Sequence, residues 1–218
     1  ATGVSFNGTS ATVFSVVDDN TITVTVPTGA TDGPITVSVG GCTGVSGGSF
    51  TVQNDATFNL KAYMQGYYIG SGAMNSVLMN QGISVDANEM DTVTVQLRDQ
   101  FDPTVVVATS VAVMNVNGEA SFTIPGTVIG GNYYIAVFHR SALQTWSALP
   151  VTFAATTSYD FTTSASQAFA DNQVEIEPGI FAMYTGDVNQ DGTDDGTDYL
   201  LIDTDIQNFG AGYVPTDL

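Results

Sequence analysis

The chain has 218 residues, of which 43% are hydrophobic and only 11% are charged, and its formal net charge is −19. This length suits one large domain or roughly two to three small ones. The 23 glycines and the many Thr, Ser and Val residues are typical of a turn-rich β protein and exclude a helical bundle or a coiled coil. The 22 acidic against 3 basic residues argue against nucleic acid and anionic membranes as partners.

The sequence shows no targeting or membrane-spanning segment. It has no run of about 18 apolar residues that could span a bilayer, and no basic stretch followed by an apolar one at its start. We therefore expect a soluble protein without membrane insertion that is either mature or a fragment. Cys42 is the single cysteine and has no Cys or His neighbour at metal-binding spacing, so we expect an incidental or buried thiol.

Residues 1–53 predict a small immunoglobulin-like sandwich. Short alternating runs that fit strands are separated by turn residues, and they cover residues 11–17, 21–26, 35–39 and 49–52. The glycine-rich stretch between the last two runs, with GVSGG at 44–48, is predicted to be a turn, because no Lys follows it to make a phosphate loop.

The segment at 4–41 resembles the TIG (IPT) family of immunoglobulin-like domains. The resemblance rests on the FNG turn at 6–8, the hairpin VPTGATDG at 26–33 and the closing ITV strand at 35–37. The strands that precede FNG in that family have no counterpart here. The resemblance therefore implies a partial domain within a longer polypeptide.

Residues 54–184 predict one larger antiparallel β-sandwich. Its expected strands are residues 57–64, 92–98, 105–116, 120–124, 133–138, 146–153, 159–162, 174–177 and 180–184. The turns have their own signals: Asn117-Gly118 suits a hairpin, Gly130-Gly131 supplies positive φ, and Asp102-Pro103 starts a turn. No long helical period appears before residue 197.

Residues 59–218 resemble a β-sandwich module found near the ends of large secreted surface proteins of Bacteroidota. The most specific parts are YYIAVFHRSALQTWSALPV at 133–151 and GDVNQDG at 186–192. In that family a dockerin-like calcium segment follows the sandwich. The resemblance implies export by the type IX route and a place at the cell surface or outside the cell.

The acidic segment at 187–198 carries the strongest chemical signal. Its spacing matches a calcium loop, in which oxygen ligands occupy positions 1, 3, 5, 7, 9 and 12 and a glycine stands at position 6. The predicted ligands are the side chains of Asp187, Asn189, Asp191 and Asp198, the carbonyl of Thr193, and Asp195 directly or through water. Asp stands at position 12, where an EF-hand has Glu, as in the dockerin pattern. Repulsion among the four carboxylates, about 1 to 4 kcal/mol for each pair, is what a divalent cation would remove.

The residues after this loop predict a helix. Tyr199, Ile202, Ile206 and Phe209 recur at helical spacing and give one apolar face that ends at Gly210, so loop and helix together resemble a dockerin half-unit. The other interpretation of the loop is an acidic, solvated turn without an ion.

The last three residues look like the beginning of a second such loop. In a longer chain Asp217 would then be a first ligand. The other interpretation of Asp217 is a frayed acidic terminus.

Catalytic signals are weak. The only histidine, His139, stands at a strand end beside Arg140, and we expect this pair to anchor the strand by hydrogen bonds or to pair with an acidic neighbour. Glu175 and Glu177 alternate with apolar residues on one strand and indicate a solvated face, in contrast to a glycosidase carboxylate pair.

Two further sets of residues have a functional and a plain interpretation. Tyr63, Tyr67, Tyr68 and Trp146 fit a sugar-stacking platform or, as we favour, core packing. Thr92 in DTV and Asn7 in NGT fit short acceptor patterns for O-linked and N-linked sugars, or are ordinary strand and turn residues.

The sequence therefore predicts a mainly β protein in three parts: a partial TIG-like domain at 1–53, a β-sandwich at 54–184 and a dockerin-like calcium loop and helix at 185–218. We expect a non-enzymatic, structural or adhesive segment of a large secreted bacterial surface protein, stabilised by Ca²⁺. Its expected partners are neighbouring domains or copies of the same chain. The alternative is a carbohydrate- or cohesin-binding module accessory to an enzyme, with glycans as possible partners.

Overall fold

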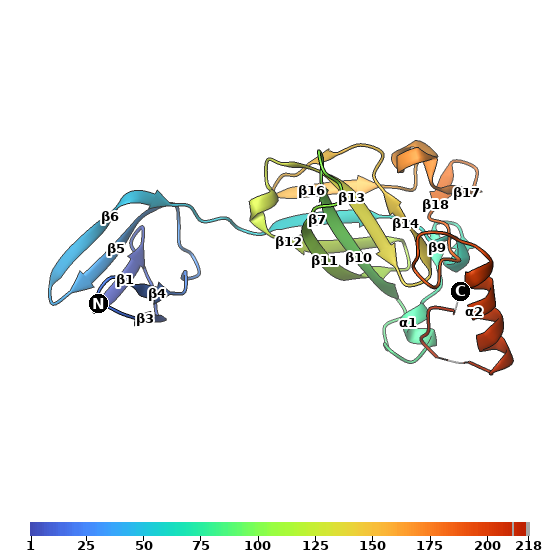
Figure 1. Cartoon of the computed structure of the whole chain (residues 1–218), viewed down its shortest axis with the longest axis horizontal. Helices are drawn as coiled ribbons and strands as arrows, with labels where there is room; N and C mark the ends of the chain where they lie inside the picture. Colours follow the sequence, from blue (N-terminus) through green and yellow to red (C-terminus); the bar gives the residue numbers. More distant parts are fainter. Residues whose placement is uncertain (211, 217–218) are drawn as a thin grey trace. The chain divides into compact units, whose positions relative to one another are not determined.

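The computed structural model describes residues 1–210 and 212–216, and the chain divides into two compact units, Ala1–Asn54 and Asp55–Leu218 (Figure 1). As the composition predicts, the protein is mainly β, with several antiparallel sheets. Within the described residues, no helix combines the length and the apolar character that crossing a bilayer requires.

The first unit is a small sheet with one separate ribbon. The sheet has the order β2-β1-β5-β6, and the ribbon pairs β3 with β4. These strands are Gly3–Phe6 (β1), Thr9–Ser10 (β2), Phe14–Val16 (β3), Ile22–Val24 (β4), Gly33–Val39 (β5) and Cys42–Phe50 (β6). Val4 and Phe6 are the buried apolar residues of this unit, and the Phe6 ring packs edge-on against Phe50 at 4.9 Å. The core of this unit is therefore thin.

The glycine-rich stretch between β5 and residue 48 is not the predicted turn. β6 runs through it and pairs antiparallel with β5, so that the turn itself is confined to Gly40 and Gly41, which both have positive φ. The prediction was wrong because backbone pairing holds β6, whose residues are nearly all exposed and show no apolar alternation. Cys42 is exposed at the start of β6, so the buried-thiol alternative is also wrong.

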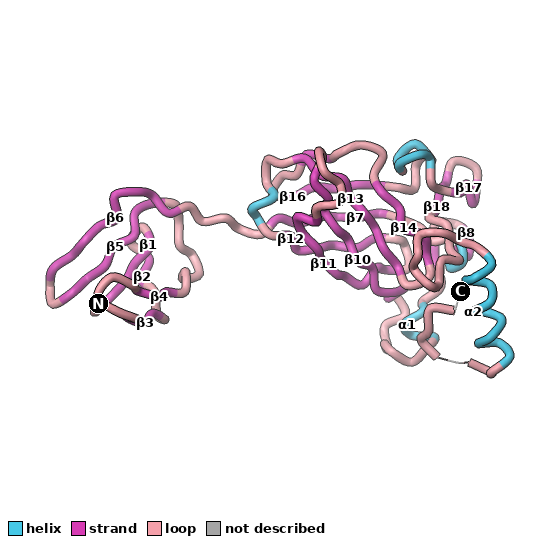
Figure 2. The backbone as a smooth tube through the Cα atoms, viewed as in Figure 1, coloured by secondary structure: helices cyan, strands magenta, loops and turns pink. Residues whose placement is uncertain are grey.

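The second unit is built on two larger sheets (Figure 2). The five-stranded sheet has the order β11-β10-β13-β14, with β15 paired to β13; its strands are Glu89–Asp99 (β10), Val106–Asn115 (β11), Asn132–His139 (β13), Ala142–Trp146 (β14) and Val151–Thr152 (β15). The three-stranded sheet has the order β12-β7-β16; its strands are Ala56–Lys61 (β7), Glu119–Ile124 (β12) and Thr156–Asp160 (β16). β16 runs parallel to β7, which departs from the predicted antiparallel arrangement.

The two sheets share one apolar core. Phe58 of β7 and Phe122 of β12 are buried together with Val95 and Leu97 of β10 and Ile135 of β13. Along β10 and β12 these buried residues alternate with more exposed ones, so each sheet buries one face. This is the sandwich that the alternating pattern predicts.

Shorter elements cover the rest of this unit: Tyr68–Gly70 (β8) with Ala73–Met74 (β9), Val174–Glu177 (β17) with Ile180–Ala182 (β18), and the helices Val77–Asn80 (α1) and Gly196–Gln207 (α2). Short 3-10 turns span Gln65–Tyr67, Gly126–Val128, Ala165–Gln167 and Phe169–Asp171. All three basic residues lie in the second unit, Lys61 in β7, Arg98 in β10 and Arg140 in the turn between β13 and β14.

Candidate functional site

The acidic loop folds around the carboxylate of Asp187, which is only 2% exposed. One of its oxygens accepts a hydrogen bond from the backbone N–H of Asp191 at 3.1 Å, and the other accepts one from the N–H of Gly192 at 3.2 Å. Gly192 has a φ of +88°, a conformation that glycine adopts at little cost. Asp187 therefore contacts Asp191 and Gly192 directly; these three residues are positions 1, 5 and 6 of the predicted loop.

Asp198 closes the loop from the first turn of α2 and is 1% exposed. Its Oδ1 accepts from the N–H groups of Val188 and Asn189 at 2.9 and 3.1 Å, and its Oδ2 accepts from the N–H of Asp195 at 3.1 Å. Asp195 is the N-cap of α2 and completes a capping box with Asp198. Two buried carboxylates therefore lie in a loop that contains no basic residue.

The other predicted ligands lie at the exposed rim of the loop. The Asn189 amide donates to Oδ2 of Asp191 at 3.0 Å, and the Thr193 hydroxyl donates to Oδ1 of the same residue at 2.5 Å. In the described part of the chain, no three His, Cys, Asp or Glu side chains converge closely enough to hold a metal ion. Ion binding would therefore have to draw the rim oxygens of Asp191 and Asp195 toward the buried pair.

The electrostatics of the loop single out Asp187. Burial raises the pKa of Asp187 and the charge of Asp198 raises it further, against the lowering effect of the N–H bonds from Gly192 and Asp191. In contrast, bonds from Thr193 lower the pKa of Asp191, and bonds from Thr197 lower that of Asp195. The carboxylate, amide and carbonyl oxygens of this loop are the ligand types that Ca²⁺ prefers. A bound cation would offset the unfavourable burial of negative charge most strongly at Asp187.

Backbone bonds tie the acidic loop to the sandwich. The N–H of Gly186 donates to the carbonyl of Ser141 at 2.8 Å, and the N–H of Leu143 donates to the carbonyl of Tyr184 at 2.9 Å. The side chain of Gln190 adds a bond to the carbonyl of Ala142 at 3.3 Å. The loop is thus joined to the start of β14.

The apolar face predicted for the C-terminal helix is largely uncovered. Ile202 is half-buried, but Tyr199, Ile206 and Phe209 are 70%, 68% and 91% exposed. The helix ends at Gln207, slightly before the predicted end. Asp217, the predicted first ligand of a second loop, lies outside the described residues.

A buried polar cluster surrounds Asp91 of β10. Its Oδ2 lies 3.0 Å from Nε2 of His139 and accepts from Nε of Arg140 at 3.0 Å, and its Oδ1 accepts from the Tyr213 hydroxyl. The Arg140 guanidinium also lies over the Tyr213 ring, 4.5 Å from its centroid. The prediction that His139 and Arg140 pair with an acidic neighbour is confirmed. The sequence did not identify Asp91 or Tyr213, because no motif connects positions so far apart.

The same cluster continues to Ser141 and Tyr67. Oγ of Ser141 lies 3.2 Å from Nδ1 of His139 and 2.8 Å from the Tyr67 hydroxyl. Asp91, His139 and Ser141 are at most 2% exposed. Because all three residues are buried, a substrate could reach these Asp–His–Ser contacts only if the core opened. The contacts therefore serve as a structural hydrogen-bond network.

Burial and charge set the protonation of this cluster. Burial lowers the pKa of His139 and Arg140 lowers it further, although Asp91 acts in the opposite direction. Burial alone would raise the pKa of Asp91, but hydrogen bonds from His139, Tyr213 and the Thr92 N–H hold it below its ordinary value. Asp91 is therefore ionised and His139 neutral near pH 7.

The four aromatic residues predicted as a platform do not come together. Tyr63 and Tyr67 are buried in the core at 5% and 3% exposure, and Tyr68 packs against Tyr63 with ring centroids 5.0 Å apart. Core packing is confirmed for these tyrosines. Trp146 lies elsewhere, beside Tyr134 at 6.3 Å.

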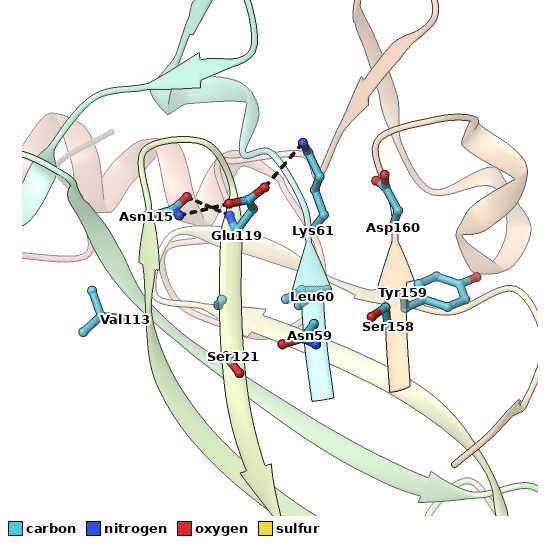
Figure 3. A pocket seen from close by; sticks show the side chains of 11 residues that line it. Asn59, Leu60, Lys61, Val113, Asn115, Glu119, Ser121, Ser158, Tyr159 and Asp160 are labelled. Carbon is cyan, nitrogen blue, oxygen red and sulfur yellow. Dashed lines mark hydrogen bonds and ion pairs between the residues drawn. The ribbon is translucent and has the colours of Figure 1, made fainter. Parts of the chain in front are cut away.

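The outer face of the three-stranded sheet and the end of β11 line a pocket of about 610 Å³ (Figure 3). The strand register places Lys61 in one cross-strand row between two carboxylates, those of Glu119 and Asp160. The next row on the same face combines Ser121, Asn59 and Ser158. The Lys61 ammonium lies 3.9 Å from Glu119. Such rows of opposite charges and hydroxyl groups stabilise cross-strand pairs.

The remaining predicted positions lie apart from these clusters. Glu175 accepts from the N–H of Gly179 in the turn after its own strand. Glu177 accepts from the N–H of Ser71 and so joins β17 to the turn between β8 and β9. Thr92 is exposed on β10, whereas the Asn7 amide donates to the Thr31 hydroxyl at 2.9 Å.

Comparison of the chain with known protein families, with curated proteins and with solved structures finds no match.

Proposed function

We propose that this chain is a structural segment of a large secreted bacterial surface protein, part of an extracellular adhesin or appendage. In this proposal a calcium ion fastens the C-terminal loop and helix to the sandwich. The role is mechanical and involves no catalysis.

Two buried carboxylates carry this proposal. Asp187 and Asp198 lie in a loop without basic residues, and the pKa of Asp187 is raised by burial and by Asp198. Asp187, Asn189, Asp191, Thr193, Asp195 and Asp198 would hold the ion. The ion would supply the positive charge that the buried carboxylates lack, and would stabilise the folded chain because the unfolded chain cannot bind it comparably.

Uncovered apolar surface supports assembly with neighbouring domains or copies of the chain. In the first unit Val13, Val17 and Val45 are each 62% exposed, although its core contains only Val4 and Phe6. The exposed residues of α2 described above add a second apolar surface. We infer that a neighbouring domain or copy would cover these apolar side chains.

Thermal unfolding with Ca²⁺ and with a chelator tests the proposal. Asp187→Asn should lose most of the calcium-dependent rise in Tm. In the chelator its Tm should stay close to that of the parent chain, because it removes a buried charge but also replaces one of the two oxygens that accept the N–H groups of Asp191 and Gly192. Asp203→Asn in α2 removes the same charge outside the loop and should keep the full calcium response. If the parent chain shows no calcium response, the loop is a solvated turn and the calcium role is wrong.

A further inference from the structure

A largely aromatic cleft of about 490 Å³ opens beside the five-stranded sheet. It is lined by Pro103, Tyr134, Trp146, Phe169, Ala170 and Asn172. Ile135, Val137 and Thr145 point into the core and are fully buried, so their neighbours Tyr134 and Trp146 stand on the outer face of the sheet. The cleft therefore exposes aromatic rings that the core does not use.

One hydrogen bond, made by its N–H group, and one cation–π contact fix the indole of Trp146. Its Nε1–H donates to Oε1 of Gln144 at 3.3 Å, and the Arg98 guanidinium lies 5.4 Å from the ring centroid. Arg98 is in turn bound to the carbonyls of Pro103 and Thr104 at 3.5 and 3.4 Å. The indole thus has one face covered by Arg98 and offers a ligand its other face and no free donor.

The segment that faces these rings is held in an uncommon conformation. Ala170 and Asp171 are consecutive non-glycine residues with φ of +55° and +54°, a region that costs an alanine about 1 to 2 kcal/mol. This turn leaves the neighbouring Phe169 side chain 59% exposed at the cleft, and the Asn172 amide donates to the Gln144 carbonyl at 3.3 Å. Backbone strain of this kind is typical of ligand-binding segments.

We propose that this cleft binds the sugar rings of a neutral oligosaccharide. The apolar faces of sugar rings stack on aromatic side chains, and the Asn172 Oδ1 atom can accept hydrogen bonds from sugar hydroxyl groups, because the amide NH2 already donates to Gln144. None of the six lining residues is charged, and the nearby Arg98 guanidinium already donates to the carbonyls of Pro103 and Thr104. The net charge of −19 also disfavours an anionic glycan. A proline-rich peptide is a poorer fit, because its carbonyls need donors and the Trp146 N–H is already bonded.

Ring geometry narrows the class of sugar chain. The planes of Tyr134 and Trp146 are inclined by 53° with centroids 6.3 Å apart. Two successive rings of a flat, β-1,4-linked chain could not stack on both planes. A curved, α-linked chain presents successive rings at an angle and suits the two planes together. None of the six lining residues belongs to the calcium loop, so this inference does not rest on the structural role proposed above.

Isothermal titration calorimetry of the full chain with maltohexaose and with cellohexaose tests the inference. We expect binding of maltohexaose and at least tenfold weaker binding of cellohexaose. Trp146→Ala and Phe169→Ala should each weaken maltohexaose binding about tenfold. Because Phe169 is exposed, its variant should fold normally. Tyr199→Ala removes an exposed aromatic side chain from α2 and should bind like the parent chain.

Three outcomes would overturn the inference. The first is the absence of binding to either sugar. The second is maltohexaose binding by the Trp146 and Phe169 variants that is as tight as binding by the parent chain. The third is binding of a polyproline peptide in place of the sugars. A preference for cellohexaose that depends on Trp146 would overturn the assignment to curved chains. None of these results would affect the calcium-dependent Tm, so the two proposals fail separately.

Discussion

The Nε2 atom of His139 lies 3.0 Å from Oδ2 of Asp91, and neither side chain has any surface exposed to solvent. The same Oδ2 accepts the Nε–H of Arg140, and Oδ1 accepts the Tyr213 hydroxyl. One carboxylate therefore joins β10, the turn after β13 and the C-terminal segment of the described chain.

Removing this carboxylate should be costly. Asp91→Ala leaves Arg140 and His139 without their shared acceptor, and we expect the free energy of unfolding to fall by about 3–5 kcal/mol. Glu119→Ala is the control, because it breaks the exposed Lys61–Glu119 pair and should cost less than about 1 kcal/mol. Urea unfolding measures both values. Equal losses in the two variants would show that the buried cluster contributes no special stability.

The buried histidine should make stability depend on pH. The pKa of folded His139 is lowered from 6.5, chiefly by burial, so below about pH 6.5 the unfolded chain takes up a proton that the folded chain does not. The free energy of unfolding should therefore decrease as the pH falls from 7.5 to 5.5, by at most about 1.4 kcal/mol per pH unit. Because His139 is the only histidine, a His139→Gln variant should show a flat profile over this range. A slope that persists in this variant would contradict the assignment.

Two glycines with similar backbone angles should respond differently to alanine. Gly118 and Gly130 have φ of +79° and +87°, but a Cβ on Gly118 would lie 2.4 Å from the Ala62 carbonyl, whereas one on Gly130 meets nothing within 4 Å. Gly130→Ala should cost about 1–2 kcal/mol from backbone strain alone. Gly118→Ala should cost distinctly more, because a backbone carbonyl has to move as well. Chemical denaturation measures the loss of unfolding free energy in both variants. Similar losses would mean that the Ala62 carbonyl moves aside at little cost.

The two units should unfold separately. Phe6 is 2% exposed and is half of the buried apolar core of the first unit, so Phe6→Ala should cost that unit about 3–5 kcal/mol or unfold it. Calorimetry should show the transition of the second unit unchanged. The matched variant Phe58→Ala, which removes a fully buried ring from the second unit, should have the reverse effect. A single transition that both variants shift equally would show that the units unfold together.

Apolar alternation predicted the fold well where a strand has one buried face. Val93, Val95 and Leu97 are fully buried on β10, as their spacing indicates. The same reasoning failed for β6, because that strand is held by backbone bonds to β5 and carries no apolar pattern. Periodicity reports burial, so a strand without a buried face gives no signal in the sequence.

The candidate sites also differ in how far the sequence predicts them. The acidic loop was predictable because its residues are close in the chain and their spacing is fixed by the backbone turns they make. The Asp91 cluster joins residues 122 positions apart, and the aromatic cleft joins Tyr134 to Phe169 through the strand order. Such sites depend on tertiary packing, which a single sequence does not encode as a local pattern.

The placement of the three basic residues has a consequence for proteolysis. Trypsin cleaves after Lys and Arg, so it can cut this chain only after Lys61, Arg98 and Arg140, all within the folded second unit. Even a fully unfolded first unit offers trypsin no cleavage site. Survival of the chain in trypsin during heating should therefore report the opening of the second unit alone, whereas a protease that cleaves at apolar residues should report both.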